Sequence, residues 1–552
     1  MMATSSESGK NWFGTSMEDI YCGHGPWAFE IPPVTASRDH AVLYELPITL
    51  DSPPKPYCSV QDHYWDDDYV WMPYSPKNLF PVENENGEKT PKESWKIIQE
   101  SLLQPIHSSR ELEVVISSYN TGLPKFLALH HFFENILEED EIRQFFEILL
   151  PRIIELALGL PDILPGNIPL LKQGCSKSIS LSQLQIASLL ANAFLCTFPW
   201  REDSVFSYPG IDFARLFAAH SRPEYQQAVA EKLKCVCHYF RRVTTKKPVG
   251  VVTFERKHFS KSQLPRWDRL KNKLSNTRIH VSSIGAIEDE GCGLLQVDFA
   301  NKNVGGGVLD FGCVQEEIRF IVYPELIVSR LFTEQLGPTE ALVVTGAERF
   351  SNYTGYGDSF MWSENCSDTT PHDSSGRRRT SIVAIDAIYF TKPAEQYSTS
   401  NVFREINKAY AGFHSRFESL LPPVATGNWG CGAFRGDPNL KSLIQLMACS
   451  AAKRDMVYFT FGDSQLCNSI HEIYIFLATN QVTISQLWRY LCQFANAKVK
   501  SEHLFSYIQQ AHFDSKHQLC IKDFFCFNKK KSEKRSPSTS THSTNNDVDV
   551  VD

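Results

Sequence analysis

Two adjacent glutamates are the residues of this sequence best suited to do chemistry. Glu316 and Glu317 follow a glycine triplet in the segment VGGGVLDFGCVQEEIRF (304–320). A carboxyl group can donate a proton to a leaving oxygen and, once ionised, accept a proton from water. Acidic residues in the first turn of a helix also complement the helix dipole, so a purely structural role is equally open for either glutamate.

Adjacency limits the mechanism that the two glutamates could share. Glycosidases that use two carboxylates place them on opposite sides of the scissile bond, about 5 Å apart or more. Neighbouring residues of a helix instead project about 100° apart. If both glutamates act, we therefore expect one to transfer the proton while the other positions the sugar.

The glycine triplet, Gly305 to Gly307, joins an expected strand to an expected helix. Glycine adopts positive φ and permits close approach, so the N–H groups of such a loop can face an anion such as a pyrophosphate. The segment fits neither the phosphate-binding G-x-x-x-x-G-K-[ST] pattern nor the dinucleotide-binding G-x-G-x-x-G pattern. A tight turn into a helix is the structural alternative.

Polar residues and a second glycine-rich segment accompany this loop. Asp298 and Asn301 lie at the end of the strand that precedes it, where either a ligand site or a capped turn is expected. The segment TGNWGCGAFRGD (426–437) leads into a helix with Asp437 as N-cap and Pro438 as first helical residue. A loop followed by a helix start can bind an anion. Two such loops could hold a diphosphate from both sides.

Two aromatic residues beside glycines could stack on a base. Tyr356 lies in YTGYGDSF (353–360) and Phe461 in YFTFGDS (458–464), and ordinary core packing is the alternative for both. The segment CVCH (235–238) has no partner pair at zinc spacing, so we expect no metal site.

The elements that must position these residues fall into two regions, which differ in the spacing of their apolar residues. Residues 94–245 show helical periodicity, and Ser182 and Gln185 stand at capping-box spacing before an apolar helix. We expect a helical domain there. Residues 1–93 are rich in Pro, Tyr, Trp and Asp without a sustained period, which predicts an extended segment packed on the domains.

Residues 246–525 alternate short apolar runs with helical stretches, which predicts an α/β fold with a parallel or mixed sheet covered by helices on both faces. Ligands of such sheets bind beyond the carboxyl ends of the strands. The polar tail, 526–552, is expected to be disordered. The expected strands are 249–255, 278–283, 294–300, 341–346, 381–390 and 455–462, and the expected helices are 403–413, 437–453 and 484–499.

Composition restricts the partners and the compartment. The formal net charge of −8 argues against general binding to nucleic acid. The fifteen cysteines are scattered singly and odd in number, which favours reduced thiols in the cytosol or nucleus. The longest apolar run, 186–198, is too short to span a bilayer. The segment KKKSEKR (529–535) is similar to a nuclear-import patch, although a solvated charge run is the simpler explanation.

Taken together, several segments resemble the poly(ADP-ribose) glycohydrolases. The pattern of GGG, seven residues and QEE resembles the signature of that family. Other blocks resemble it in the same order, namely LQVDFAN, YTGYG, TGNWGCGAF and YFTFGD, and upstream LLANAFLCTFP and YFRRVT resemble its accessory domain. The likeness extends from about residue 10 to about residue 515. It implies a macrodomain, with a mixed sheet between helices, fused to an N-terminal mainly helical domain.

The resemblance also implies an activity, the hydrolysis of ribose–ribose O-glycosidic bonds of poly(ADP-ribose) to release ADP-ribose, without a metal or cofactor. Glu317 would be the acid/base that protonates the leaving ribose oxygen and then activates water, while Glu316 would hold hydroxyls of the ribose whose bond is cut. Asn301 would assist there, and Asp298, counted with the catalytic residues, would support the same loop.

The remaining implied contacts surround the other parts of ADP-ribose. The diphosphate and distal ribose would lie among Gly305, Gly306, Gly307, Asn428, Gly432, Ala433 and Phe434. The adenine edge would meet Glu288 and Gln315, and its face would meet Tyr356 and Phe461. Ile287 would be a further substrate-binding residue.

Two places depart from the family pattern. Asp310 and Phe311 stand where small, neutral residues are expected, and a carboxylate near a pyrophosphate would repel it unless it points away. Arg435, next to Phe434, is also unusual and could compensate with its positive charge.

The expected partner is poly(ADP-ribose) on modified proteins. We expect no direct contact with DNA, no membrane attachment, a monomer, and residence in the nucleus, the cytoplasm or both. Two other functions are open, namely a macrodomain reader that binds ADP-ribose without cutting it and a hydrolase of single ADP-ribose groups on proteins. The presence of Glu317 favours the glycohydrolase over the reader, because a reader needs the glycine loops but no acid.

Overall fold

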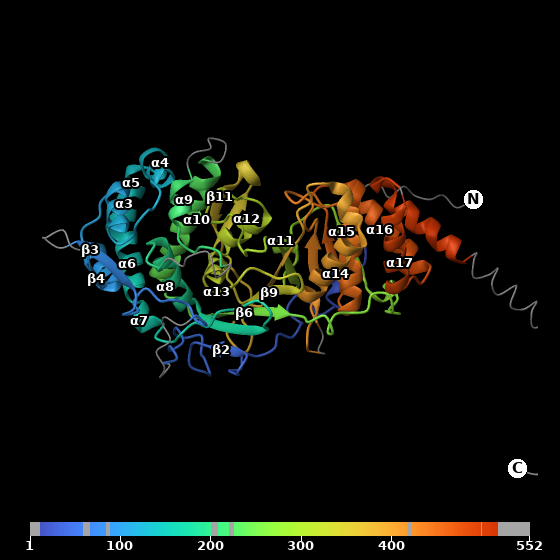
Figure 1. Ribbon diagram of the computed structural model, residues 1–552, viewed down its shortest axis with the longest axis horizontal. Helices are drawn as coiled ribbons and strands as arrows, with labels where there is room; N and C mark the ends of the chain where they lie inside the picture. The colour runs from blue at the N-terminus through green and yellow to red at the C-terminus, as the bar shows by residue number, and fades with distance from the viewer. Residues whose placement is uncertain are drawn as a thin grey trace, which may run out of the picture.

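A helical region and a sheet region lie side by side in the computed structural model of the chain (Figure 1). The structure describes residues 11–58, 67–83, 89–199, 208–219, 226–417, 421–497 and 499–516. The predicted disordered tail and its basic segment lie outside this part of the chain. None of the helices in the described ranges is both long enough and apolar enough to cross a membrane.

Within the described ranges the main sheet contains ten strands in the order β1-β7-β14-β13-β8-β12-β9-β6-β5-β2. Five neighbours at its centre, from β7 to β12, run parallel, and β9 and β6 continue it antiparallel. The strands are β1 (Trp12–Gly14), β2 (His40–Val42), β5 (Lys177–Ser182), β6 (Val251–His258), β7 (Ile279–Ser282), β8 (Leu295–Ala300), β9 (Glu340–Thr345), β12 (Ser381–Asp386), β13 (Val424–Gly427) and β14 (Met456–Phe459). The predicted mixed sheet is confirmed.

All six predicted strand runs are strands, as β6, β7, β8, β9, β12 and β14. The run 381–390 was predicted too long, because β12 ends at Asp386. The sequence prediction missed β13, whose four residues lie between a helix and the second glycine-rich segment. The predicted helices are also present, as α14 (Thr399–Phe413), α15 (Pro438–Ala451) and α17 (Ile484–Asn496).

Strand β12 shows why the sequences of the central strands are continuous apolar runs. Ile382 and Ala384 face a core shared with the helical region, and Val383 and Ile385 face a second core under α14 and α15. Both faces of the strand are therefore buried, as expected for a sheet covered by helices on both sides. The second face is also covered by α16 (Ser464–Thr479).

The helical region packs directly on the first face of the sheet. Its elements are α2 (Ser94–Leu102), α3 (Ser109–Ser118), α4 (Leu127–His131), η1 (Phe132–Ile136), α5 (Glu139–Gln144), η2 (Phe145–Leu149), α6 (Leu150–Leu158), α7 (Leu160–Ile163), α8 (Gln183–Phe194), α9 (Ala214–Ala218) and α10 (Gln226–Thr245). The predicted capping box of α8 is confirmed. The backbone N–H of Gln185 donates to Ser182 Oγ, and the backbone N–H of Ser182 donates to Gln185 Oε1.

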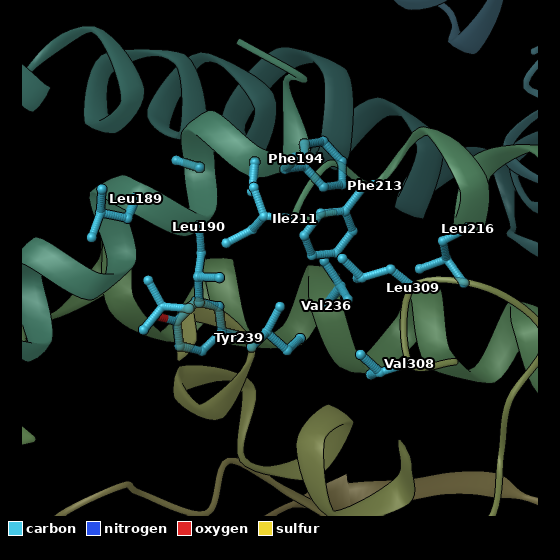
Figure 2. Packing of buried hydrophobic residues seen from close by; sticks show 14 of the residues in the cluster. Leu189, Leu190, Phe194, Ile211, Phe213, Leu216, Val236, Tyr239, Val308 and Leu309 are labelled. Carbon is cyan, nitrogen blue, oxygen red and sulfur yellow. The ribbon is translucent and has the colours of Figure 1, made fainter. Parts of the chain in front are cut away.

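One strand departs from the expectation that residues 94–245 are helical. Strand β5 lies inside that range, yet it pairs with β6 and belongs to the main sheet. Its alternating Ile179 and Leu181 side chains complete the core on the helical face. A single apolar cluster therefore runs through the helical region and the sheet, and Figure 2 shows part of it around α8, α9 and α10.

The N-terminal segment reaches both edges of the sheet. Strand β1 pairs antiparallel with β7 at one edge, and β2 pairs with β5 at the other. Between them the chain is held by Arg379, whose Nη1 donates to the carbonyls of Trp27 and Phe29 at 3.1 Å each. Further along, β3 (Leu79–Glu83) and β4 (Lys89–Glu93) form a separate hairpin. The cysteines of the described ranges are free.

A buried ion pair between β6 and β9 provides a test of what stabilises the fold. Arg256 is fully buried, pairs with Glu340, and donates to the carbonyls of Leu171 and Gln335 at 2.9 Å each. Replacing Arg256 with Met would leave the Glu340 carboxylate without its main partner. We expect Arg256→Met to lower the free energy of unfolding by about 3–5 kcal/mol, as measured by denaturant titration.

A matched control is Arg110→Met, because Arg110 forms an exposed ion pair with Glu134. Exposed pairs contribute about 1 kcal/mol or less, so this variant should unfold close to wild type. Equal losses in the two variants would contradict the importance of the buried pair.

Candidate active site

The carboxyl ends of the five parallel strands meet at one edge of the sheet, which is where ligands of α/β sheets bind. Two long loops leave this edge. The first glycine loop, residues 301–314, follows β8 and leads into α12 (Gln315–Val322). The second glycine loop, residues 428–437, follows β13 and leads into α15. The predicted order of strand, glycine loop and helix is therefore confirmed for the first segment, and the predicted order of glycine loop and helix for the second.

The first glycine loop folds around the two adjacent glutamates. Glu316 accepts hydrogen bonds from the backbone N–H of Asn301 at 2.8 Å and of Gly305 at 2.6 Å. Glu317 accepts from the N–H of Gly307 at 2.9 Å and of Val314 at 3.0 Å. The two carboxylates thus share one loop as a common source of donors.

This arrangement differs from the expectation that the glycine amides face an anionic ligand. The amides of Gly305 and Gly307 donate to the glutamates, and the amide of Gly306 donates to the carbonyl of Asn303 at 3.0 Å. The physical reason is that two buried carboxylates need donors close at hand. Contacts of these glycines with a diphosphate remain a prediction and would have to use other atoms.

Glycine is required in the loop because the glutamates occupy the space around it. At Gly306, φ is +45° and an added Cβ would lie 2.4 Å from Glu317 Oε1 and 2.7 Å from Glu316 Oε2. At Gly312 an added Cβ would lie 2.8 Å from the same carboxylate oxygen of Glu317. The missing side chains therefore make room for the two carboxyl groups.

Both glutamates are buried, and burial affects the pKa of Glu316. Glu316 is 3% exposed and Glu317 7% exposed. Burial, and then the charges of Asp298 and Glu317, raise the pKa of Glu316 well above its usual range, although the amides of Asn301 and Gly305 oppose the shift. The site therefore disfavours the charged form of Glu316.

Asp298 on β8 is fully buried, and neither of its carboxylate oxygens has a hydrogen-bond partner among the described residues. Burial raises its pKa to about 8, the charge of Arg319 opposes this shift and the charge of Glu317 adds to it. Arg319 itself pairs with Gln296 and lies over the ring of Tyr323 at 4.8 Å. Asp298 is therefore not an ordinary turn cap, whereas Asn301 is, because its Oδ1 accepts from the N–H of Asn303 at 3.0 Å.

A buried arginine holds the opposite side of the loop. Arg330, on α13 (Ser329–Phe332), donates through Nη1 to the carbonyls of Val304 at 3.2 Å and Gly306 at 2.9 Å, and through Nε to the carbonyl of Gly210 at 2.9 Å. Burial lowers its pKa to about 10, and Glu316 and Glu317 oppose that shift. Sequence reasoning missed Arg330, although an arginine inside the apolar segment ELIVSRLF (325–332) was an available signal.

The residues predicted at the adenine edge gather beside the first glycine loop. Glu288, on α11 (Ile287–Glu290), accepts from the hydroxyl of Tyr353 at 2.5 Å. The side chain of Gln315 bonds the backbone of β8, accepting from the N–H of Phe299 at 2.8 Å and donating to the carbonyl of Val297 at 3.2 Å. Ile287 is buried in a small apolar core, so only its backbone is available to a ligand.

The two predicted stacking residues are exposed rather than buried. Tyr356 is 58% exposed, and its hydroxyl accepts from the N–H of Gln315 at 3.2 Å. Phe461 is 46% exposed, has φ +52° and lies edge-on to Phe299 with ring centroids 6.5 Å apart. The alternative of ordinary core packing is therefore wrong for both, while their contact with a base remains a prediction.

The second glycine loop is fixed at its base and exposed at its tip. Asn428 accepts from the hydroxyl of Tyr458 at 3.0 Å, and Asp437 caps α15 by accepting from the N–H of Leu440 at 3.0 Å, as predicted. Gly432 and Ala433 at the tip are exposed. The ring of Phe434 lies edge-on to that of Tyr389 with centroids 6.1 Å apart.

The two unusual residues of the loops have structural explanations. The carboxylate of Asp310 accepts from the N–H of Phe311 at 2.9 Å and lies 3.7 Å from Nε of Arg215 on α9, so it faces the helical region. Its neighbour Leu309 is buried in the same core as α9 and α10 (Figure 2). The guanidinium group of Arg435 lies over the ring of Tyr389, 5.6 Å from its centroid, and the ion-pair partner of Asp310 is Arg215.

No group of three or more His, Cys, Asp or Glu side chains in the described ranges is arranged to hold a metal ion. The cysteines of the CVCH segment lie on α10, where Cys235 is buried.

The five parallel strands, the two glycine loops and the enclosed carboxylates define an α/β domain with a candidate active site at the edge of its sheet, joined to a helical domain. Comparison with known proteins gives a closer relationship. The macro-domain-fold part of poly(ADP-ribose) glycohydrolase matches residues 264–468, and the helical domain of the same family matches residues 137–256.

Individual relatives agree with these matches. A probable poly(ADP-ribose) glycohydrolase 2 of Arabidopsis thaliana is 34% identical over 433 residues, which cover 67% of this chain and 81% of the relative. Poly(ADP-ribose) glycohydrolase 1 of the same plant is 32% identical over 445 residues, or 66% and 80% of the two chains. Poly(ADP-ribose) glycohydrolase 1 of Caenorhabditis elegans is 36% identical over 351 residues, or 61% and 43%. The chain belongs to the poly(ADP-ribose) glycohydrolase family, and its fold is a macrodomain with a helical N-terminal domain.

A methyl group at Gly306 tests whether the loop must wrap both carboxylates. We expect Gly306→Ala to lower the rate of catalysis by about 100-fold, because displaced carboxylates lose their alignment with the substrate. The control is Gly122→Ala, since Gly122 has φ +76° and no atom within 4 Å of an added Cβ. That variant carries similar backbone strain and should keep wild-type activity. Equal activity of the two variants would contradict the proposed packing.

The raised pKa of Asp298 predicts a pH-dependent stability. Its folded-state pKa of about 8 lies above the ordinary value of 3.8, so between these values the unfolded chain loses a proton that the folded protein keeps. Wild type therefore loses stability as pH rises through this window. Asn stays neutral, so Asp298→Asn should gain stability over wild type, by at most about 1.4 kcal/mol per pH unit, until about pH 8.

Denaturant titration at about pH 5.5, about pH 7 and about pH 8.5 measures this difference. Asp268→Asn is the control, because the Asp268 side chain is 53% exposed. A pH-independent difference between Asp298→Asn and wild type would contradict a protonated Asp298.

Proposed function

We propose that this protein is a poly(ADP-ribose) glycohydrolase that hydrolyses ribose–ribose O-glycosidic bonds and releases ADP-ribose. The observation that carries the proposal is the pair of adjacent, buried glutamates enclosed by a glycine loop at the carboxyl end of β8. Membership of the family supports it. The bond to be cut is an acetal, so its cleavage needs a proton on the leaving oxygen and stabilisation of an oxocarbenium-like transition state.

The two glutamates have different proposed roles. Glu317 protonates the leaving ribose oxygen and then activates water, and Glu316 holds hydroxyls of the ribose whose bond is cut. Glu317 is the more exposed of the two, which supports its access to the leaving oxygen. The raised pKa of Glu316 suits a neutral carboxyl that donates a hydrogen bond to a sugar hydroxyl. Asp298 and Asn301 support the same loop.

The rest of ADP-ribose is proposed to lie along the same sheet edge. The diphosphate and distal ribose lie between the two glycine loops, near Asn428 and the exposed tip at Gly432 and Ala433. Adenine lies beside Glu288 and Gln315, with the exposed rings of Tyr356 and Phe461 available to its face. Aromatic faces of this kind contribute about 1–3 kcal/mol per stacked base.

Two alternative functions use the same site. A macrodomain reader would bind ADP-ribose through the glycine loops without cutting it, and a hydrolase of single ADP-ribose groups would cut a protein-linked bond. We propose poly(ADP-ribose) on modified proteins as the partner, with residence in the nucleus, the cytoplasm or both. We also propose that the protein is a monomer that contacts neither DNA nor membranes directly.

Release of free ADP-ribose from purified polymer tests the function. We expect wild type to release it and Glu317→Gln to release it at least about 100-fold more slowly, the usual contribution of a general acid. Binding of ADP-ribose, measured by calorimetry, should survive in Glu317→Gln. It should weaken roughly tenfold or more in Glu316→Ala, because that change removes the hydrogen bond to the ribose.

The exposed Glu364 provides the matched control, and Glu364→Gln should behave as wild type. Binding without release by wild type would favour the reader. Release only from protein carrying single ADP-ribose groups would favour the third function. Wild-type rates in Glu317→Gln would contradict its role as the acid.

A further inference from the structure

A buried lysine of the helical domain contacts the first glycine loop. Lys232, on α10, is fully buried, and its Nζ donates to the carbonyls of Asp310 at 2.7 Å, Gly312 at 2.7 Å and Gly307 at 3.3 Å. An ammonium group has three N–H donors, so each finds one acceptor in the same turn. Figure 1 shows α10 running beside α12, the helix that carries the two glutamates.

The turn that Lys232 holds is also the turn that contacts Glu317. Gly307 accepts from Lys232 through its carbonyl and donates to Glu317 Oε1 through its N–H at 2.9 Å. Gly312 likewise accepts from Lys232, and its Cα side faces Glu317 so closely that an added Cβ would lie 2.8 Å from the carboxylate. Lys232 and Glu317 therefore lie on opposite sides of one short stretch of backbone.

A lysine is an unfavourable residue for this position unless its charge has a use. Burial lowers the pKa of Lys232 to about 8, and the charges of Cys313, Glu317 and Asp310 only partly offset the effect. The next turn of α10 and the loop residues after Gly307 are part of an apolar core, to which Val236, Val308 and Leu309 belong (Figure 2). Apolar residues of similar volume are often as stable as a buried charge, so stability alone does not account for the lysine.

We propose that Lys232 is a positioning residue for Glu317, through which the helical domain fixes the turn from Gly307 to Gly312 in the geometry that catalysis needs. The inference rests on the proposed function for its catalytic readout. It makes the helical domain a part of the active site without any contact with the substrate.

Two substitutions test the proposal in the full-length chain. Lys232→Met keeps the side-chain length and removes the donors, so the turn loses three hydrogen bonds. We expect kcat for polymer hydrolysis to fall by about 10- to 100-fold while KM changes by less than about 3-fold, because a misplaced acid affects chemistry more than binding. Amide hydrogen exchange over residues 303–314 should become faster, since the carbonyls of the turn are no longer held.

Lys257→Met is the matched control. Lys257 lies on β6, donates to the carbonyls of His414 at 2.8 Å and Gly412 at 3.4 Å, and has a pKa that burial also lowers to about 8. Its acceptors belong to the end of α14, away from the first glycine loop. We expect it to alter thermal stability comparably to Lys232→Met while leaving kcat and exchange over 303–314 unchanged.

The outcomes separate this inference from the proposed function. Wild-type kcat and wild-type exchange over 303–314 in Lys232→Met would overturn the positioning role, as would equal effects in Lys257→Met. If Lys232→Met does not fold, kcat and amide exchange over residues 303–314 are measured in Lys232→Arg instead. The guanidinium donors of that variant cannot reproduce the geometry of an ammonium group. Failure of wild type to release ADP-ribose would reject the function, whereas the exchange comparison would still report on the turn.

Discussion

The site depends on a layer of peptide groups that lies between two carboxylates and two buried cations. On one side the backbone N–H groups of Asn301, Gly305, Gly307 and Val314 donate to Glu316 and Glu317. On the other side carbonyls of the same loop accept from Arg330 and Lys232. The loop dipoles therefore connect the two carboxyl groups with the two buried cations, without direct contact between the side chains. Glycine is needed at Gly306 and Gly312, because an added Cβ at either position would collide with the carboxyl group of Glu317.

The carboxyl group of Glu317 has both a structural role and a proposed chemical role. Glu317 satisfies the N–H of Val314 at the start of α12, as an acidic residue in a first helical turn commonly does. The structural role and the catalytic role proposed for it are therefore compatible. The carboxyl groups of Asp298 and Glu316 are held in a site that raises their pKa values, so the folded protein keeps protons that the unfolded chain would lose. Such costs are expected where a fold supports a reaction.

Sequence patterns predicted the elements better than the contacts between them. The strands around Asp298, the N-cap at Asp437 and the capping box at Ser182 follow local rules of periodicity and hydrogen bonding, and the structure contains them. The partners of the glycine amides could not be predicted, because they depend on how Glu316 and Glu317 turn back onto the loop. Lys232 and Arg330 were missed for a similar reason: each is distant in sequence from the loop carbonyls it holds, and only the packing of α10 and α13 brings it there. Strand β5 was missed because its partner β6 lies beyond a long helical segment.

The position of β8 at the centre of the sheet also has a consequence for synthesis on the ribosome. Its two neighbours, β12 and β13, both follow it in the chain, and β13 begins only at Val424. Until that segment leaves the exit tunnel, β8 and the carboxylates beyond it cannot be enclosed, whereas β5, β6 and the helices can already pair and pack. Non-local pairing of this kind slows folding and leaves strand edges open to other chains. The order of the strands in the chain therefore allows helices of the N-terminal half to form before the reactive centre can be enclosed.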